Sequence, residues 1–112
     1  MRQPTAVLLA LCALATVTLA PSGARAADYT LTIKDHKFTP TELKVTANKR
    51  VTIEVINNDV TPEEFESKEL KVEKVIAGNS RGTVRIGPLK PGKYPFVGEF
   101  HEDTAKGTVI AE

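Results

Sequence analysis

The chain has 112 residues, with 15 Lys and Arg against 14 Asp and Glu, and 41% of its residues are hydrophobic. This near balance of charge argues against nucleic acid or an anionic membrane surface as the main partner. With one cysteine, one methionine and no tryptophan, the chain has no disulfide framework.

Residues 1–26 are predicted to be a secretory signal peptide. Arg2 gives the positive start, an apolar run follows over residues 6–20, and Ala-Arg-Ala at 24–26 forms a small-x-small cleavage site. The run is too short for a membrane-spanning helix, and Cys12 lies inside it rather than at a lipidation site. We therefore expect a periplasmic protein with no direct membrane anchor.

The predicted mature domain, residues 27–112, is one domain with a modest core. The leader takes the only cysteine and the only methionine with it, and 13 basic and 14 acidic residues remain. Copper sites built on thiolate or thioether ligands are therefore excluded by composition, whatever the fold.

Alternating apolar and polar residues predict short strands along the mature chain. The clearest candidates are residues 29–34, 43–45, 51–56, 83–86, 94–100 and 107–111. Turn-forming residues separate them, including Asn57-Asn58-Asp59 and the Pro-rich and Gly-rich connection 88–92. About seven short strands between such turns predict an all-β sandwich.

The acidic stretch 62–70 is the one segment where a helix is also expected. Its helix propensity is fair, and the apolar residues after it continue the pattern, which predicts one short helix around residues 67–76. A solvated loop or an edge strand is the alternative for this stretch.

Four motifs resemble the cupredoxin family of small copper-binding β-sandwiches. Residues 38–45 are similar to its F-x-P-x-x-L-x-V opening, residues 51–59 to its third strand with an Asn-rich end, and residues 89–94 to its L-x-P-G-x-Y entry. Residues 94–107 resemble its metal loop. The resemblance implies a cupredoxin-like Greek-key β-sandwich. The segment TPEEFES, residues 61–67, is most similar to the EfeO-type members, which are periplasmic and accompany iron-uptake permeases.

The chain departs from the blue-copper pattern at three of four ligand positions. Gly98 stands where the family has cysteine, and Ala105 where a methionine could be. A glutamate, Glu63 or Glu64, takes the place of the first histidine, and His101 alone is retained. An electron-transfer cupredoxin is therefore disfavoured.

His101 and nearby carboxylates are the candidate metal ligands, because imidazole suits copper, iron and zinc and carboxylate suits harder cations. Alternate residues of a strand point to opposite faces, so only one of Glu63 and Glu64 can face His101, with Glu64 slightly favoured. Glu99 and His36, the only other histidine, are further candidates. The alternative is that these are ordinary exposed polar residues.

These residues predict a site for a copper and/or iron ion, and no catalytic triad or phosphate-binding loop is present. The resemblance implies a role in iron uptake, by oxidising Fe(II) or handing it on. The implied partners are a membrane iron permease and a periplasmic iron-binding protein. A different class of function stays open, a metal-free interaction module that presents the acidic loop to a transport complex.

Overall fold

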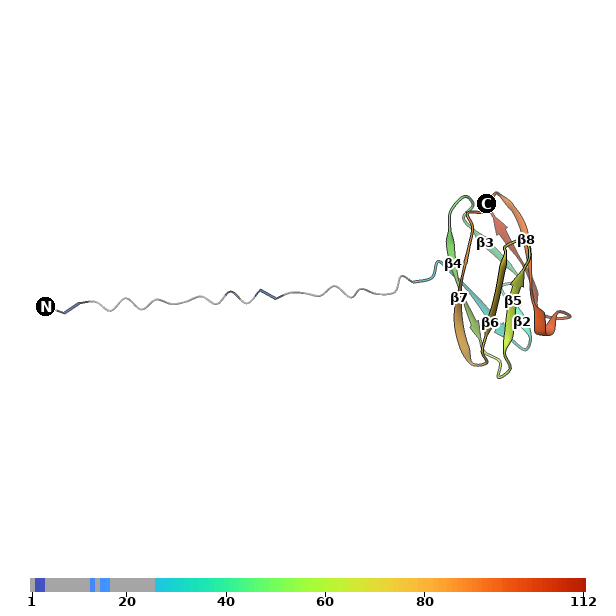
Figure 1. Cartoon of the computed structure of the whole chain (residues 1–112), viewed down its shortest axis with the longest axis horizontal. Helices are drawn as coiled ribbons and strands as arrows, with labels where there is room; N and C mark the ends of the chain where they lie inside the picture. Colours follow the sequence, from blue (N-terminus) through green and yellow to red (C-terminus); the bar gives the residue numbers. More distant parts are fainter. Residues whose placement is uncertain (1, 4–12, 14, 17–25) are drawn as a thin grey trace.

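A computed structural model describes residues 2–3, 13, 15–16 and 26–112 of the chain (Figure 1). The predicted signal peptide, residues 1–26, lies almost entirely outside the described residues, and its cleavage stays a prediction. Across the described ranges, no helix has the length and apolar character needed to cross a membrane.

Within this described part, nine strands form a sandwich of two sheets (Figure 1). The strands are β1 Tyr29–Lys34, β2 Lys37–Thr39, β3 Glu42–Val45, β4 Val51–Asn57, β5 Glu63–Ser67, β6 Val72–Ile76, β7 Ser80–Ile86, β8 Gly92–Gly98 and β9 Lys106–Ala111. One sheet has the order β2-β1-β4-β7 and the other β3-β9-β8-β5-β6. The predicted all-β sandwich is confirmed, with nine strands in place of about seven.

The two sheets bury alternate residues of their strands between them. In β4, for example, Val51, Ile53 and Val55 are buried while the residues between them are partly exposed. Three buried phenylalanines, Phe38, Phe65 and Phe96, pack with ring centroids 4.9 to 6.1 Å apart. Because residues two apart in a strand share a face, Phe65 and Phe96 place Glu63 and Gly98 on the core side of the sheet.

The predicted helix around residues 67–76 is wrong. The segment forms the end of β5, a turn and the edge strand β6. Lys71 adopts a left-handed φ of 57°, and Ser67 Oγ accepts the backbone N–H of Leu70 at 3.1 Å, which closes the turn. The alternation of buried Glu63, Phe65 and Ser67 fits a strand, and this burial outweighs the fair helix propensity of the stretch.

Three connections meet at one end of the sandwich. They are the β1–β2 turn, the β4–β5 loop, and the 3-10 helix η1, Glu99–His101, which follows β8 where the strand was expected to continue to residue 100. The buried side chain of Asn57 fixes the β4–β5 loop, since its Nδ2 donates to the carbonyl of Thr61 at 2.9 Å and its Oδ1 accepts the N–H of Asp59 at 3.0 Å. These connections carry the candidate site.

Candidate metal site

The centre of the candidate site is a pair formed by His101 and Glu63. Glu63, the first residue of β5, is 1% exposed, whereas the His101 side chain at the end of η1 is 26% exposed. Glu63 Oε2 lies 2.5 Å from His101 Nδ1, and Glu63 Oε1 accepts the backbone N–H groups of Phe100 at 2.9 Å and Glu64 at 3.1 Å. Both oxygens of this buried carboxylate therefore have partners, as a buried charge requires.

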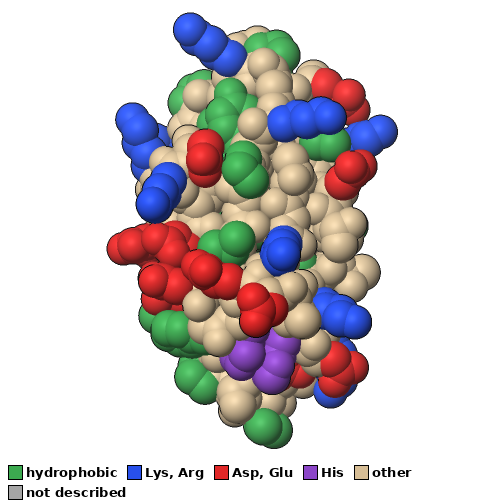
Figure 2. Space-filling model, turned by 90° about the vertical axis from the view of Figure 1, so that its right-hand side faces the viewer, with side chains coloured by type: hydrophobic (Ala, Val, Ile, Leu, Met, Phe, Trp, Pro, Cys, Tyr) green, Lys and Arg blue, Asp and Glu red, His purple; other side chains and the backbone are tan. Residues whose placement is uncertain are grey.

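His36 stacks on His101 with the ring centroids 3.5 Å apart and the planes 10° from parallel. It sits in the β1–β2 turn with a left-handed φ of 57°, and its Nε2 lies 3.4 Å from Thr61 Oγ1. Two ring systems from distant parts of the sequence thus meet at the rim. Figure 2 shows the two histidines side by side on the surface.

Asp59 holds the turn that carries His36. Its carboxylate accepts the backbone N–H of Asp35 at 2.8 Å and that of His36 at 3.0 Å. The hydrogen bond from the His36 backbone, followed by that from Asp35, lowers the pKa of Asp59 below its usual value despite its burial. The left-handed turn is therefore fixed by an ionised side chain from the β4–β5 loop.

The Glu63 carboxylate lies against residue 98, where a blue-copper site would require a cysteine. A Cβ added to Gly98 would lie 2.7 Å from Glu63 Cδ and 2.7 Å from Ala105 Cβ. Gly98 also donates its backbone N–H to the carbonyl of Ala105 at 2.9 Å. Glycine at 98 is thus what allows Glu63 to reach His101, and a larger side chain would displace it.

Glu64 and Glu99 belong to a second group of carboxylates, outside the sheet. They lie with Glu66 and Glu73, and one oxygen from each of the four side chains is within 4.8 Å of the others. A side-chain hydrogen bond with Glu99 raises the pKa of Glu66, since two carboxylates this close favour sharing a proton. Figure 2 shows acidic side chains gathered beside the histidines.

The structure therefore divides the five predicted ligand residues into two sets. His101, Glu63 and His36 come together at the rim. Glu64, the slightly favoured candidate, points away with Glu99 into the carboxylate group. Only one of the two neighbouring glutamates, Glu63, faces His101, as the alternation of side chains along a strand predicts.

The rim set offers two imidazoles and one carboxylate. Nitrogen and oxygen donors of this kind suit copper(II), iron and zinc. Soft sulfur donors are absent from residues 27–112, and the space beside residue 98 is filled by Glu63. The residues present therefore fit an ion of hard or borderline character and do not fit the blue-copper centre.

Two residues that support the site, Asp59 and Thr61, were not singled out from the sequence. Asp59 was assigned only to a turn that ends a strand. An aspartate directly after a strand is a known acceptor for backbone N–H groups, which is a local signal. Its actual partners lie 23 and 24 residues earlier in the chain, so no local pattern identifies them.

Comparisons with known proteins identify the family and the fold of the chain. The model of the cupredoxin-like domain family matches residues 5–111. A protein of Rickettsia prowazekii (strain Madrid E), RP394, is 44% identical over 80 residues, which are 71% of this chain and 64% of that protein. The matched region thus spans less than two thirds of that relative's length.

Solved structures show the same fold. A methionine-to-alanine mutant of amicyanin in its Cu(I) form has a TM-score of 0.64 at 20% identity, covering 81% of this chain and 87% of amicyanin. The metal-binding domain of the Cu(I)-exporting P-type ATPase CopA of Streptococcus pneumoniae, with Cu(I), has a TM-score of 0.62 at 13% identity, covering 74% and 82%. With a family match across nearly its whole length and this shared sandwich, the chain belongs to the cupredoxin-like domain family.

Proposed function

We propose that this chain is a metal-binding protein that takes a copper or iron ion at the rim of the sandwich. The observation that carries the proposal is the buried carboxylate of Glu63 placed on the ring of His101, with His36 stacked beside it. His101 and Glu63 would hold the ion, and His36 would join them after its ring turns out of the stack, because the nitrogen lone pairs of two stacked imidazoles lie in parallel planes. The partly exposed His101 ring leaves the site open to solvent on one side.

The finer role that we propose is assistance in iron uptake in the periplasm. Its support is the likeness of residues 61–67 to EfeO-type proteins and the predicted signal peptide. Carboxylate oxygen stabilises Fe(III) relative to Fe(II), so a site containing Glu63 would favour oxidation of Fe(II) by copper or oxygen. The oxidised iron, or Fe(II) itself, would pass to a membrane permease.

The carboxylate group beside the site has a supporting part in this proposal. Glu64, Glu66, Glu73 and Glu99 form one group of carboxylates, and Figure 2 shows acidic side chains beside the histidines. Clustered charge of one sign raises the local concentration of ions of the opposite sign. We assign Glu64 and Glu99 to this attraction of cations rather than to direct contact with the ion at His101.

Metal titration of the domain 27–112 tests the proposal. Cu(II), Fe(II) and Fe(III) are added to the wild type and to His101→Ala, with Glu102→Gln, an exposed neighbour, as the control. We expect His101→Ala to weaken binding by at least about tenfold, since loss of even a residue that only orients a ligand typically costs about 10- to 100-fold in metal affinity. Equal binding by His101→Ala and the wild type would remove His101 from the site.

A second measurement addresses oxidation separately from binding. The loss of Fe(II) over time is followed with oxygen present, with and without one equivalent of copper. We expect the wild type to accelerate the loss and Glu63→Gln to slow it. Binding of iron with no acceleration would leave a protein that hands iron on, without oxidising it.

A metal-free interaction module is the second candidate, and two observations favour it. Every buried side-chain nitrogen and oxygen in the described residues already has a hydrogen-bond partner, so the rim needs no ion to satisfy its polar groups. In addition, Val60 is 82% exposed in the β4–β5 loop and Phe100 is 47% exposed beside His101. If no metal binds more tightly to the wild type than to His101→Ala, the interaction module is favoured, with the exposed Val60 and Phe100 as part of its contact surface.

A further inference from the structure

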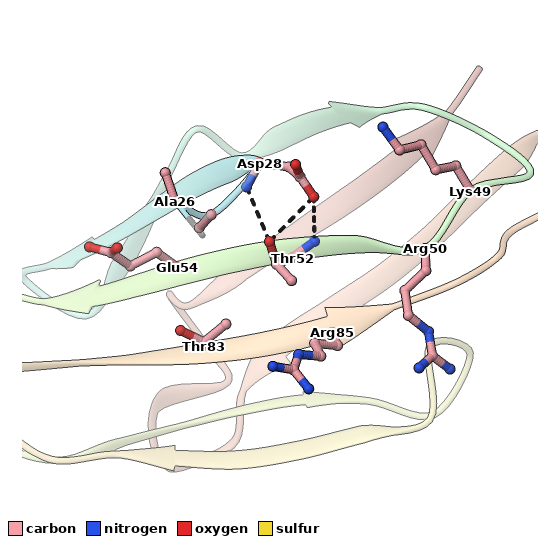
Figure 3. Close-up of a pocket in the computed structure, with 9 residues that line it drawn as sticks. Ala26, Asp28, Lys49, Arg50, Thr52, Glu54, Thr83 and Arg85 are labelled. Carbon is pink, nitrogen blue, oxygen red and sulfur yellow. Dashed lines mark hydrogen bonds between the residues drawn. The ribbon is translucent and has the colours of Figure 1, made fainter. Parts of the chain in front are cut away.

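A groove of about 750 Å³ lies on the outer face of the four-stranded sheet, away from the histidines (Figure 3). Its walls come from the segment before β1, from the turn that leads into β4, and from β4 and β7. The lining residues are Ala26, Ala27, Asp28, Lys49, Arg50, Thr52, Glu54, Thr83 and Arg85. This volume is in the usual range for small-molecule sites, about 300–1,000 Å³.

The carboxylates in the groove are already engaged. Asp28 Oδ2 accepts the backbone N–H of Thr52 at 2.9 Å and its hydroxyl at 3.3 Å, as the dashed lines in Figure 3 show. Glu54 Oε1 is 2.9 Å from Nη1 of Arg81, which lies outside the groove. Both negative charges therefore have partners that fix or neutralise them.

The cationic side chains of the groove, in contrast, form no ion pairs within the described part of the chain. Among the residues that the structure describes, no carboxylate pairs with the side chains of Arg50, Arg85 or Lys49. In Figure 3 the guanidinium groups of Arg50 and Arg85 extend to the same side of β4, and Lys49 extends to the other. Arg85 lies directly opposite Thr52 in the β4–β7 register, and Thr83 lines the groove from the same strand as Arg85. The groove is thus a wall of hydrogen-bond donors with an excess of positive charge.

We propose that this groove binds a small ligand with two or more anionic oxygens, a phosphate or a polycarboxylate. A guanidinium group presents a planar fork of donors that matches carboxylate and phosphate oxygens. Arg50 and Arg85 supply two such forks, and Lys49 adds a point charge at the other side. The Thr83 hydroxyl supplies a further donor for an oxygen that the arginines do not reach.

Processing of the chain would reinforce the site. Ala26 and Ala27 line the groove, and the predicted signal peptidase cut falls between them, so the mature groove keeps eight of its nine lining residues and is more open where Ala26 was. Cleavage there would leave the ammonium group of Ala27 in the groove as a fourth cation. The mature protein is therefore expected to bind the anion more tightly than a chain extended before residue 27.

The groove is independent of the proposed metal site. β4 enters the sheet at Val51, next to Arg50, and reaches the histidine rim only after Asn57. A strand of seven residues spans roughly 20 Å at about 3.3 Å per residue. A protein that binds no metal at His101 would still have this groove, so the two proposals fail separately.

Titration of the domain 27–112 with inorganic pyrophosphate and with tricarballylate, a tricarboxylate, tests the proposal. Backbone amide shifts are followed by NMR at a salt concentration of about 0.15 M, where unspecific surface attraction is screened. We expect saturable shifts at Thr52, Thr83 and Arg85 with at least one of the two anions. The absence of saturable shifts at these residues with both anions would overturn the proposal.

Variants that remove one positive charge test whether the arginines of the groove contact the anion. Arg50→Gln and Arg85→Gln are each expected to weaken binding about tenfold, the effect of losing one charge-assisted hydrogen-bonding group. Lys93→Gln, which removes a cation from the other sheet, is the matched control and should change affinity less than twofold. Equal effects of Lys93→Gln and Arg85→Gln would mean a response to net charge alone and would overturn the site.

Two further comparisons separate the remaining outcomes. Glu54→Gln removes an anion from the groove and frees Arg81, so it is expected to strengthen binding by about two- to fivefold. Vesicles with anionic phospholipid distinguish a lipid headgroup from a free anion. Binding to vesicles with none to pyrophosphate or tricarballylate would contradict the small-ligand proposal and favour a membrane surface.

Discussion

Glu63 and Glu64 are neighbours on β5, yet they lie in opposite environments. Glu63 is 1% exposed and is hydrogen-bonded to His101 and to two backbone N–H groups. Glu64 is partly exposed and lies among three other carboxylates. The one-residue difference changes the face of the strand and with it the partner. A glutamate on the inner face is thus hydrogen-bonded to an imidazole, whereas a glutamate on the outer face lies among carboxylates that repel one another.

Replacement of Glu63 by alanine is expected to have the largest effect on the fold. Glu63→Ala leaves the N–H groups of Phe100 and Glu64 without acceptors and opens space beside Gly98. Loss of a buried, hydrogen-bonded charge of this kind costs about 2–4 kcal/mol of unfolding free energy. Denaturant unfolding of the domain 27–112 measures it.

The matched control is the neighbouring residue on the other face. Glu64→Ala removes the same atoms from a partly exposed side chain, and we expect a change within about 0.5 kcal/mol, as for an ordinary surface position. Similar losses for the two variants would break the comparison, because burial and hydrogen bonding would then not distinguish the two glutamates.

A substitution at Gly98 tests whether the buried Glu63 side chain fills the space beside this residue. An added methyl group in Gly98→Ala would lie 2.7 Å from Glu63 Cδ and from Ala105 Cβ, and such overpacking costs about 1–3 kcal/mol. With Glu63→Ala as the background, part of this cost should disappear, because one of the two clashing groups is gone. A double-mutant cycle measures this coupling, and strictly additive losses would show that Glu63 does not occupy the space beside residue 98.

Much of the fold follows from period-two alternation in the sequence. The segments around β1, β4 and β7 were recognised because buried and exposed side chains alternate there. β6 was not recognised, because three of its five residues are exposed, including Glu73 and Lys74, and it carries no apolar alternation. Charged residues are usual on an edge strand, where pairing on one side is sufficient and burial is slight.

The candidate site was predictable in its residue types but not in its contacts. His101, His36 and a glutamate from residues 63–64 were expected at one rim, and the structure brings His101, His36 and Glu63 together. Which glutamate turns inward follows from the alternation within β5, because the buried Phe65 shares its face with Glu63 and not with Glu64. The contact of Glu63 with His101 depends in addition on the pairing of Phe65 with Gly98, 33 positions apart, which no local pattern in the sequence fixes.

Asp59 tests how strongly the rim depends on support from a neighbouring loop. Asp59→Asn keeps the shape but accepts fewer of the two N–H bonds from His36 and Asp35, so we expect a loss of about 1–2 kcal/mol at pH 7. Because the pKa of Asp59 is lowered in the folded protein, its stabilisation is complete above the unfolded value of about 3.9. The stabilisation is lost as the pH falls through the folded pKa.

Unfolding of wild type and Asp59→Asn between pH 3 and pH 7 checks the sign. The difference in unfolding free energy should be largest near neutral pH and should shrink below about pH 4, where the unfolded carboxyl group also becomes protonated. A difference that grows on acidification would contradict the account of Asp59 as an ionised acceptor.

The carboxylate group on the other face is expected to give the smallest effect, a change in titration with little change in the fold. The hydrogen bond with Glu99 raises the pKa of Glu66, so Glu99→Gln, which removes the second acid, should lower that pKa toward its usual value. Carbon-13 NMR titration of the glutamate carboxyl groups measures the shift, with Glu102→Gln, outside the group, as the control. An unmoved Glu66 pKa would mean that the two acids do not share a proton. A lowered pKa would show that Glu99 and Glu66 repel each other when both are ionised, a repulsion that a bound cation would reduce. Glu63, on the inner face, differs because His101 and two backbone N–H groups already contact its carboxylate.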